Sequence, residues 1–189
     1  MSPTKQRIFE EAARLFQEKG YPAASMRDLA ARVDLSVSSL YSHIGGKEEI
    51  LQKICFDNAR HYLRVMDEVE SSLDDPAEQV RTLILQHIQI ALEDITSVTV
   101  FNDEWRHLSE PYLSEFAKMR KDYERRFIKI IVTGQEQGKF APIDPTIALF
   151  TMLTSLRWLH QWYPAKKGIS KKALEANILA MLMMGLEKR

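Results

Sequence analysis

The stretch that decides the fold is Leu35–Lys47, LSVSSLYSHIGGK, which carries four serines and ends in two glycines and a lysine. On a helix that turns 100° per residue, the apolar side chains of this stretch share one side, and the polar ones share the other. The apolar side consists of Val37, Leu40, Tyr41 and Ile44. The polar side consists of Ser38, Ser39, Ser42 and His43. Serine does not stabilise a helix interior, so propensity does not explain this face. We expect the apolar side to pack inward and the polar side to face outward.

Two more short helices are expected before this stretch. The first has an apolar stripe that includes Ile8 and Phe16, and it ends at Gly20, a residue that tolerates positive φ. The second begins with a capping box at Ser25-Met26-Arg27-Asp28. Asp34 follows the second helix, and aspartate is one of the few residues other than glycine that adopt the left-handed conformation. Three short helices with a tight turn before the third predict a helix-turn-helix.

In a helix-turn-helix domain of three helices, the third is the recognition helix, which lies in the DNA major groove, where small hydroxyls approach base edges and phosphates. Between Lys19 and Lys47 there are four basic and two acidic residues, a local excess of two positive charges. Lys47 begins the next helix, where an ammonium group and free amides together suit a phosphate. The alternative is a small solvated helix that carries its serines by chance.

The first 51 residues resemble the DNA-binding domain of TetR-family transcriptional regulators. The matching stretches are RIFEEAARLFQEKGYPAASMRDLAARV and LSVSSLYSHIGGKEEIL. The positions that carry the family's pattern are Leu40, Tyr41, His43, Ile44, Lys47 and Glu48. Asp34 stands where the family usually has glycine, and Ile44 where it usually has phenylalanine. Both departures are physically tolerable.

This resemblance implies a cytoplasmic homodimer that binds a near-palindromic operator in double-stranded DNA and releases it when a small molecule enters the C-terminal domain. The DNA contacts that it implies are Ser25, Arg27, Val37, Ser38, Ser39, Tyr41, Ser42, His43 and Lys47. Of these, we expect phosphate contacts from Ser25, Tyr41 and Lys47. We expect base contacts from Val37, Ser38, Ser39 and Ser42.

The remaining sequence also has the periodicity of helices, so we expect an all-α fold of about nine helices. The long helices are expected near 47–71, 76–91, 111–134, 146–163 and 170–186. The β-branched segment Ile95–Phe101 is interpreted as a loop that enters a helix. We expect a DNA-binding domain over residues 1–46 and a domain for ligand binding and dimerisation over residues 47–189.

Several polar and aromatic side chains fall among apolar positions of the middle helices, as a ligand pocket requires. The candidate ligand residues are Tyr62, Met66, His87, Asn102, Trp105, Arg106, Tyr123, Phe127, Trp158 and Trp162. Each of them has an alternative interpretation as an ordinary core residue. The segment from Phe101 to Phe127 is similar to a TetR subgroup that senses acyl-coenzyme A thioesters. That similarity implies an acyl-CoA or a related lipophilic acid as the effector, with Arg106, Arg120 and Lys121 either at the coenzyme phosphates or simply solvated.

Family analogy places the dimer interface on the last two helices, which carry more apolar residues than one buried stripe needs. These residues are Ile147, Phe150, Leu153, Leu156, Leu174, Ile178, Met181, Leu182 and Leu186. The alternative is that they are all buried within one protomer.

Composition limits the other classes of function. Cys55 is the only cysteine, so there is neither an intrachain disulfide nor a thiolate cluster, as is usual for a cytoplasmic protein. The longest uncharged apolar stretch, Pro145–Leu156, is too short to span a membrane. Glu104 and His107 have the spacing of a helical metal motif, but the second such motif is missing. A metal-binding bundle enzyme that uses this pair is therefore the weaker alternative, and we expect no cofactor, no metal and no catalysis.

Overall fold

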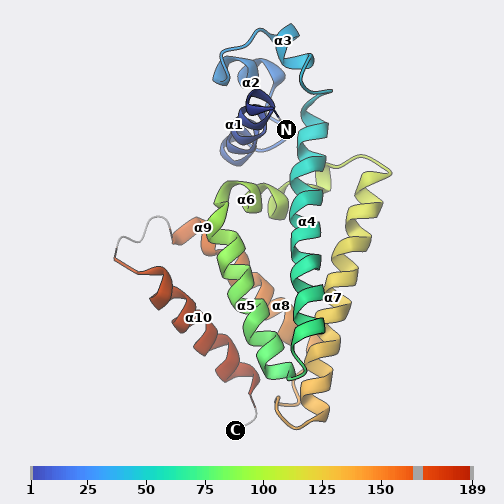
Figure 1. Ribbon diagram of the computed structural model, residues 1–189, viewed down its shortest axis with the longest axis vertical. Coiled ribbons are helices and arrows are strands. Elements are labelled where there is room, and N and C mark those ends of the chain that lie inside the picture. The colour runs from blue at the N-terminus through green and yellow to red at the C-terminus, as the bar shows by residue number, and fades with distance from the viewer. Residues whose placement is uncertain (1, 164–167, 188–189) are drawn as a thin grey trace. The chain divides into compact units, whose positions relative to one another are not determined.

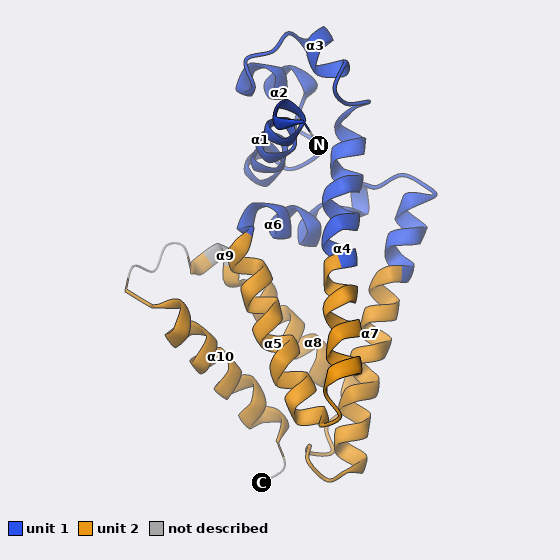
Figure 2. Cartoon of the chain, viewed as in Figure 1, with its two compact units in different colours: residues 1–60, 94–118 blue, residues 61–93, 119–189 orange. Residues whose placement is uncertain are grey.

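The computed structural model describes residues 2–163 and 168–187, and these residues form two compact units (Figures 1 and 2). Unit 1 comprises residues 1–60 and 94–118, and unit 2 comprises residues 61–93 and 119–189. All regular elements of the described residues are helices, and Phe140 and Glu187 form an isolated β-bridge. The prediction of an all-α fold is confirmed.

Unit 1 is built on the three short helices that the sequence predicts. Its elements are α1 (Pro3–Lys19), α2 (Met26–Arg32), α3 (Val37–Tyr41), the first half of α4 (Lys47–Ser72), α6 (Ile95–Asp103), the 3₁₀ helix η1 (Trp105–His107) and the start of α7 (Tyr112–Glu136). Phe16, Leu29 and Leu40 are almost fully buried where α1, α2 and α3 pack together.

Serine side chains cap the short helices, and Asp34 makes the turn between α2 and α3. Ser25 forms the expected capping box with Asp28, and Ser36 caps α3 by accepting a hydrogen bond from the amide of Ser39. Asp34 has φ of 55°, as predicted for this position, and its carboxylate lies 3.0 Å from the guanidinium of Arg7 on α1. The third helix is shorter than predicted, because α3 ends at Tyr41.

The interpretation of residues 95–101 as a loop is wrong, because they belong to helix α6. The side chain of Asp94 caps this helix by accepting a hydrogen bond from the amide of Ser97 at 2.9 Å. Val98 and Val100 are buried in unit 1, and burial of this size outweighs the weak helix propensity of β-branched residues. Within unit 1, α6 also contacts α1, where the amide nitrogen of Gln17 donates to the hydroxyl of Thr99.

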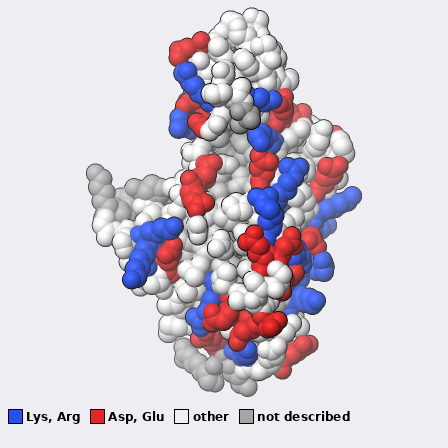
Figure 3. Space-filling view, in the orientation of Figure 1, with Lys and Arg blue, Asp and Glu red and all other residues white. Residues whose placement is uncertain are grey.

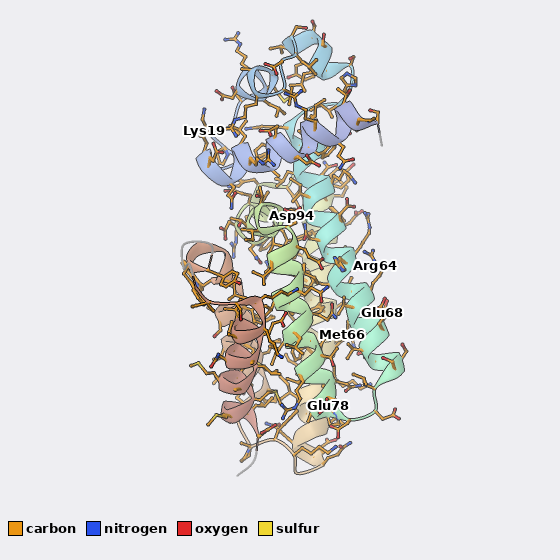
Figure 4. The ribbon with its side chains drawn as sticks, turned by 60° about the vertical axis from the view of Figure 1, so that its left-hand side comes forward. Lys19, Arg64, Met66, Glu68, Glu78 and Asp94 are labelled. Atoms are coloured by element: carbon orange, nitrogen blue, oxygen red, sulfur yellow. The ribbon has the colours of Figure 1, made fainter. Side chains whose placement is uncertain are left out.

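Unit 2 contains the second half of α4, most of α7 and four further helices. These are α5 (Pro76–Glu93), α8 (Pro145–Arg157), α9 (Leu159–Trp162) and α10 (Lys171–Leu186). The single helix expected over residues 146–163 is interrupted at Trp158, which separates α8 from α9. In Figure 4, Met66 lies on the inner side of α4, whereas Arg64 and Glu68 point away from the bundle.

Two polar clamps and one close approach hold unit 2 together. The guanidinium of Arg126 on α7 binds Glu70 and Asp67 of α4, each at 2.6 Å. The amide of Ala141 donates to the carbonyl of Leu186 at 2.8 Å, which fixes the end of α10. The ring of Phe140 packs onto Gly134, where a Cβ atom would lie only 2.2 Å from it.

Candidate functional site

Helix α3 presents a polar, uncharged surface on top of a buried anchor. Leu40 is fully buried and Ile44 is 3% exposed, so these two residues fix the short helix to unit 1. Val37 and Tyr41 are 36% and 51% exposed. The prediction that they pack inward with Leu40 is therefore wrong, because five residues of helix bury only one narrow side. The predicted outward face is present, with Ser38, Ser39 and Ser42 exposed and His43 half-buried.

The serine hydroxyls of this face are held in fixed directions before any partner arrives. The hydroxyls of Ser38 and Ser39 both lie 2.9 Å from the hydroxyl of Ser36. The hydroxyl of Ser42 donates to the carbonyl of Ser39 at 2.7 Å. Hydroxyls that are ordered in advance lose less conformational entropy when they bind.

At the start of α2, Ser25 and Arg27 are both exposed, as the predicted contacts require. The hydroxyl of Ser25 donates to Asp28 at 2.7 Å, and this bond, followed by the contact with Lys19, lowers the pKa of Asp28 to about 2. Among the described residues, Arg27 has neither an ion-pair nor a hydrogen-bond partner, so its guanidinium is available to a ligand.

Lys47 differs from its predicted role, because its ammonium group points into unit 1. The Nζ atom donates to the carbonyls of Tyr21, Pro22 and Ala24 at 3.0, 3.3 and 3.1 Å. It also lies 4.5 Å from the centre of the Tyr21 ring, at cation–π distance. In this conformation all three ammonium hydrogens have partners, so Lys47 fixes the segment before α2 instead of facing outward.

The other charges of the helix-turn-helix are largely neutralised within unit 1. The ion pairs are Lys5–Glu49, Arg7–Asp34, Arg14–Glu11, Lys19–Asp28 and Arg32–Glu18. In the space-filling view of Figure 3, the α3 end of unit 1 is mostly uncharged, and basic and acidic side chains alternate below it.

The sequence reasoning did not find that residues 94–118 support the helix-turn-helix within unit 1. The imidazole of His107 stacks on the ring of Tyr21, with centroids 5.7 Å apart, and its Nε2 lies 3.3 Å from Glu104. The amide of Ser109 donates to Glu48, the second residue of α4, at 3.0 Å. No periodicity in the sequence indicates the His107–Tyr21 and Ser109–Glu48 contacts, because they join segments that are about 60 to 90 residues apart.

The candidate ligand residues are divided between the two units. Tyr62, Met66, His87, Tyr123 and Phe127 come together in the interior of unit 2, where every one of them except the partly exposed His87 is buried. Trp158 and Trp162 also belong to unit 2, but both are exposed.

The other three candidates belong to unit 1. They are Asn102, Trp105 and Arg106, and the guanidinium of Arg106 lies 4.7 Å from the centre of the Trp105 ring. Glu104 and His107, the alternative metal pair, are in the 3.3 Å contact described above, and the described residues contain no group of three or more side chains that could hold a metal ion. In the same part of the chain, no helix is both long enough and apolar enough to cross a bilayer.

A short helix with an exposed hydroxyl face, packed on two others across a tight turn, defines a DNA-binding protein of the helix-turn-helix class. The family profile described as bacterial regulatory proteins of the tetR family matches residues 8–54. A second profile, described as a tetracyclin repressor-like C-terminal domain, matches residues 73–186, which is more than half of the chain. The chain belongs to the TetR family and is a DNA-binding regulator of transcription.

Known relatives support the same fold over nearly the whole chain. The transcriptional repressor KstR2 of Mycobacterium tuberculosis is 22% identical over 183 residues, which cover 96% of this chain and 92% of the relative. The structure of the ketosteroid transcriptional regulator KstR2 of that organism superimposes with a TM-score of 0.92 at 21% identity, covering 100% of this chain and 97% of that one.

Two other solved structures are similar. PfmR, a TetR-family regulator of Thermus thermophilus, is 30% identical with a TM-score of 0.81, covering 96% of this chain and all of that one. AibR, in complex with isovaleryl coenzyme A and operator DNA, is 24% identical with a TM-score of 0.83, covering 95% of this chain and 98% of that one.

Proposed function

We propose that the protein is a repressor that binds a near-palindromic operator as a homodimer and is released by a small molecule. The observation that carries the proposal is the face of α3, on which Val37, Ser38, Ser39, Tyr41 and Ser42 are exposed above the buried Leu40. A face of small hydroxyls and two apolar surfaces suits base edges and thymine methyl groups in a major groove.

Individual contacts on DNA follow from the chemistry of each side chain. Ser38, Ser39, Ser42 and Val37 are assigned to base edges. Ser25 and Tyr41 are assigned to phosphates, and Arg27 and the half-buried His43 are further contacts of the predicted set. Lys47, the third predicted phosphate contact, is replaced in this proposal by the main chain at the start of α4, because its ammonium group is bound to carbonyls. The Ser38→Ala variant should change the preference at one base position, and Tyr41→Ala should weaken binding to all sequences equally.

DNase footprinting of the promoter region next to the gene that encodes this protein tests the repressor assignment. We expect two protected half-sites on one face of the duplex, about 10 base pairs apart or a multiple of that spacing. Protection of a single half-site would count against a dimeric operator-binding protein. So would the absence of a footprint at protein concentrations high enough to saturate nonspecific DNA.

The interface of the homodimer is assigned to the exposed apolar side chains of α8 and α10. Ile147 and Phe150 on α8 are 63% and 43% exposed, and Met181 and Met184 on α10 are 76% and 65% exposed. An open groove of about 700 Å³ follows α8 from Thr146 to Trp158. Leaving this much apolar surface in water is unfavourable, and a second protomer would cover it.

Light scattering on the purified protein tests the dimer. Phe150→Glu should convert the dimer to a monomer, and Arg64→Glu, an exposed change on α4 of the same unit, should not. A dimer that withstands Phe150→Glu would place the interface elsewhere.

The effector is assigned to the interior of unit 2, and its proposed class is an acyl-CoA thioester or a related lipophilic acid. Support comes from the polar rings inside this apolar unit and from the isovaleryl coenzyme A in the AibR complex. Within unit 2, Arg120 and Lys121 are the candidate partners of the coenzyme phosphates, whereas Arg106, the third residue of the predicted set, belongs to unit 1. Calorimetric titration with acyl-CoA thioesters and the matching free acids tests this class, and the absence of binding by both kinds would exclude it.

A further inference from the structure

Three polar rings from three helices meet inside unit 2. The imidazole of His87 on α5 stacks on the ring of Tyr62 on α4, with centroids 4.6 Å apart. The Nε2 atom of His87 lies 2.7 Å from the hydroxyl of Tyr123 on α7. Met66 and Phe127, which lie four residues further along α4 and α7, are fully buried. The three polar rings therefore lie next to buried apolar side chains.

All three rings are uncharged near neutral pH. Burial lowers the pKa of His87 to about 4, so the imidazole is neutral. Burial raises the pKa of Tyr62 and of Tyr123, so both keep their phenolic hydrogens. The neighbouring cation, Arg126, is bound to Glu70 and Asp67 and so brings no free positive charge to the cluster.

The His87–Tyr123 pair has one hydrogen more than its mutual bond uses. A neutral imidazole carries one N–H and a tyrosine one O–H, and the single bond between them uses one of these two donors. If Tyr123 donates, the Nδ1–H of His87 remains, and if His87 donates, the O–H of Tyr123 remains. Each tautomer therefore leaves one donor.

The side chain of His87 is only partly covered by protein. The described residues give His87 no hydrogen-bond partner other than Tyr123, and its side chain keeps accessible surface although protein surrounds it closely enough to desolvate it. The imidazole is therefore largely desolvated yet incompletely covered by protein, which leaves room for contact with a small molecule. The Tyr62 ring covers one face of the imidazole, so a ligand approaches the donor along the imidazole edge.

We infer that the His87–Tyr123 pair recognises one uncharged carbonyl oxygen of the effector, as found in a thioester, an ester or a ketone. This inference rests on the proposed function, because it concerns the effector of the same unit. A carbonyl accepts the spare hydrogen. A saturated chain leaves this donor unsatisfied, and a free carboxylate brings a charge that no nearby cation offsets.

Two coenzyme A derivatives that differ only at the carbonyl test the inference on the full-length protein. Octanoyl-CoA is a thioester, and S-octyl-CoA is the thioether with the same chain and no carbonyl oxygen. We expect calorimetry to give about tenfold tighter binding of the thioester, because the thioether leaves a desolvated donor unpaired. Methyl octanoate should likewise bind about tenfold more tightly than octanoate.

The deciding variant is the double substitution His87→Phe, Tyr123→Phe, which removes both donors whatever the tautomer. The thioester should then lose its advantage and bind within about twofold of the thioether, since a factor of two is only a small part of the hydrogen bond's contribution. Tyr112→Phe is the matched control, because it removes an exposed phenol from the same helix, outside the cluster, and should keep the preference.

Operator release, followed by fluorescence anisotropy, separates the two claims. If S-octyl-CoA or octanoate releases the operator as well as its carbonyl partner does, the regulator stands and the carbonyl inference fails. The inference also fails if neither carbonyl probe binds the wild type, or if the double variant keeps the preference. If no small molecule extracted from the host releases the operator, the proposed function itself fails.

Discussion

Raising the salt concentration from 50 to 200 mM should weaken operator binding by only about 12-fold. The affinity of a protein for duplex DNA falls with a slope of about −0.9 per neutralised phosphate on a log–log plot, because each contact releases condensed counterions. In the described residues up to Lys47, Arg27 is the lysine or arginine with no partner inside unit 1. One such contact from each protomer of the proposed homodimer gives a slope of about −1.8.

A cation that is already bound to a carboxylate adds little to this slope. If Arg7 moved to a phosphate, Asp34 would be left beside the DNA as an unpaired negative charge, which cancels the gain. Most of the sequence-dependent affinity should then come from hydroxyl, amide and apolar contacts, whose strength depends weakly on salt.

Fluorescence anisotropy of a labelled operator at several KCl concentrations between 50 and 200 mM measures the slope. The Arg27→Ala variant should bring it close to zero, and Arg7→Ala, which removes an exposed but paired cation, should leave it unchanged. A wild-type slope steeper than about −5, equivalent to a roughly thousandfold loss over this range, would refute the reasoning.

Four further predictions concern stability and are checked by chemical denaturation. Lys47→Met should cost about 1–3 kcal/mol, because three carbonyls lose their donor, and should leave the salt slope of operator binding unchanged. Leu40→Ala should cost about 2–5 kcal/mol by emptying the anchor of α3, whereas the exposed Val37→Ala should cost far less. Gly134→Ala should destabilise by about 1–3 kcal/mol, because its Cβ would overlap the Phe140 ring, and equal stability would show that the ring moves away freely. The folded pKa of Asp28 lies below its ordinary value of 3.8, at about 2, so its stabilising contribution is complete above that ordinary value. That contribution should be lost as the pH falls from about 3.8 to about 2, and the difference in stability between wild type and Asp28→Asn should disappear over the same range.

Local signals in the sequence predicted the helix-turn-helix well. The capping box at Ser25, the left-handed Asp34 and the apolar spacing of Leu40 and Ile44 each depend on residues only a few positions apart. Such signals are physically self-contained, so periodicity and capping preferences were sufficient to place α1, α2 and the start of α3.

The errors occurred where tertiary packing outweighs local preference. The β-branched residues after Asp94 form a helix because Val98 and Val100 are buried in unit 1. Val37 and Tyr41 share a helical side with Leu40, but a five-residue helix touches its support over too narrow an area to cover them.

The sites show the same division between local and long-range information. The exposed serines of α3 followed from helical geometry, whereas the inward direction of Lys47 depends on carbonyls that lie more than twenty residues away in the sequence. For the candidate ligand residues, spacing along each helix placed Tyr62, His87 and Tyr123 on inward positions but could not indicate that Asn102, Trp105 and Arg106 belong to the other unit.

The DNA-binding unit is discontinuous along the chain, and this affects how such proteins can be cut or recombined. A fragment ending after residue 60 would lack residues 94–118, and so it would uncover the apolar side of α1 and leave the Tyr21 ring without the His107 imidazole. A chimaera that joins only the first sixty residues to the ligand-binding domain of another regulator would contain the exposed face of α3. It would lack residues 94–118, which pack against α1 and Tyr21. We therefore expect that a graft which keeps the support of this helix-turn-helix takes two separate stretches of this chain, the second of which lies inside the segment matched by the C-terminal family profile.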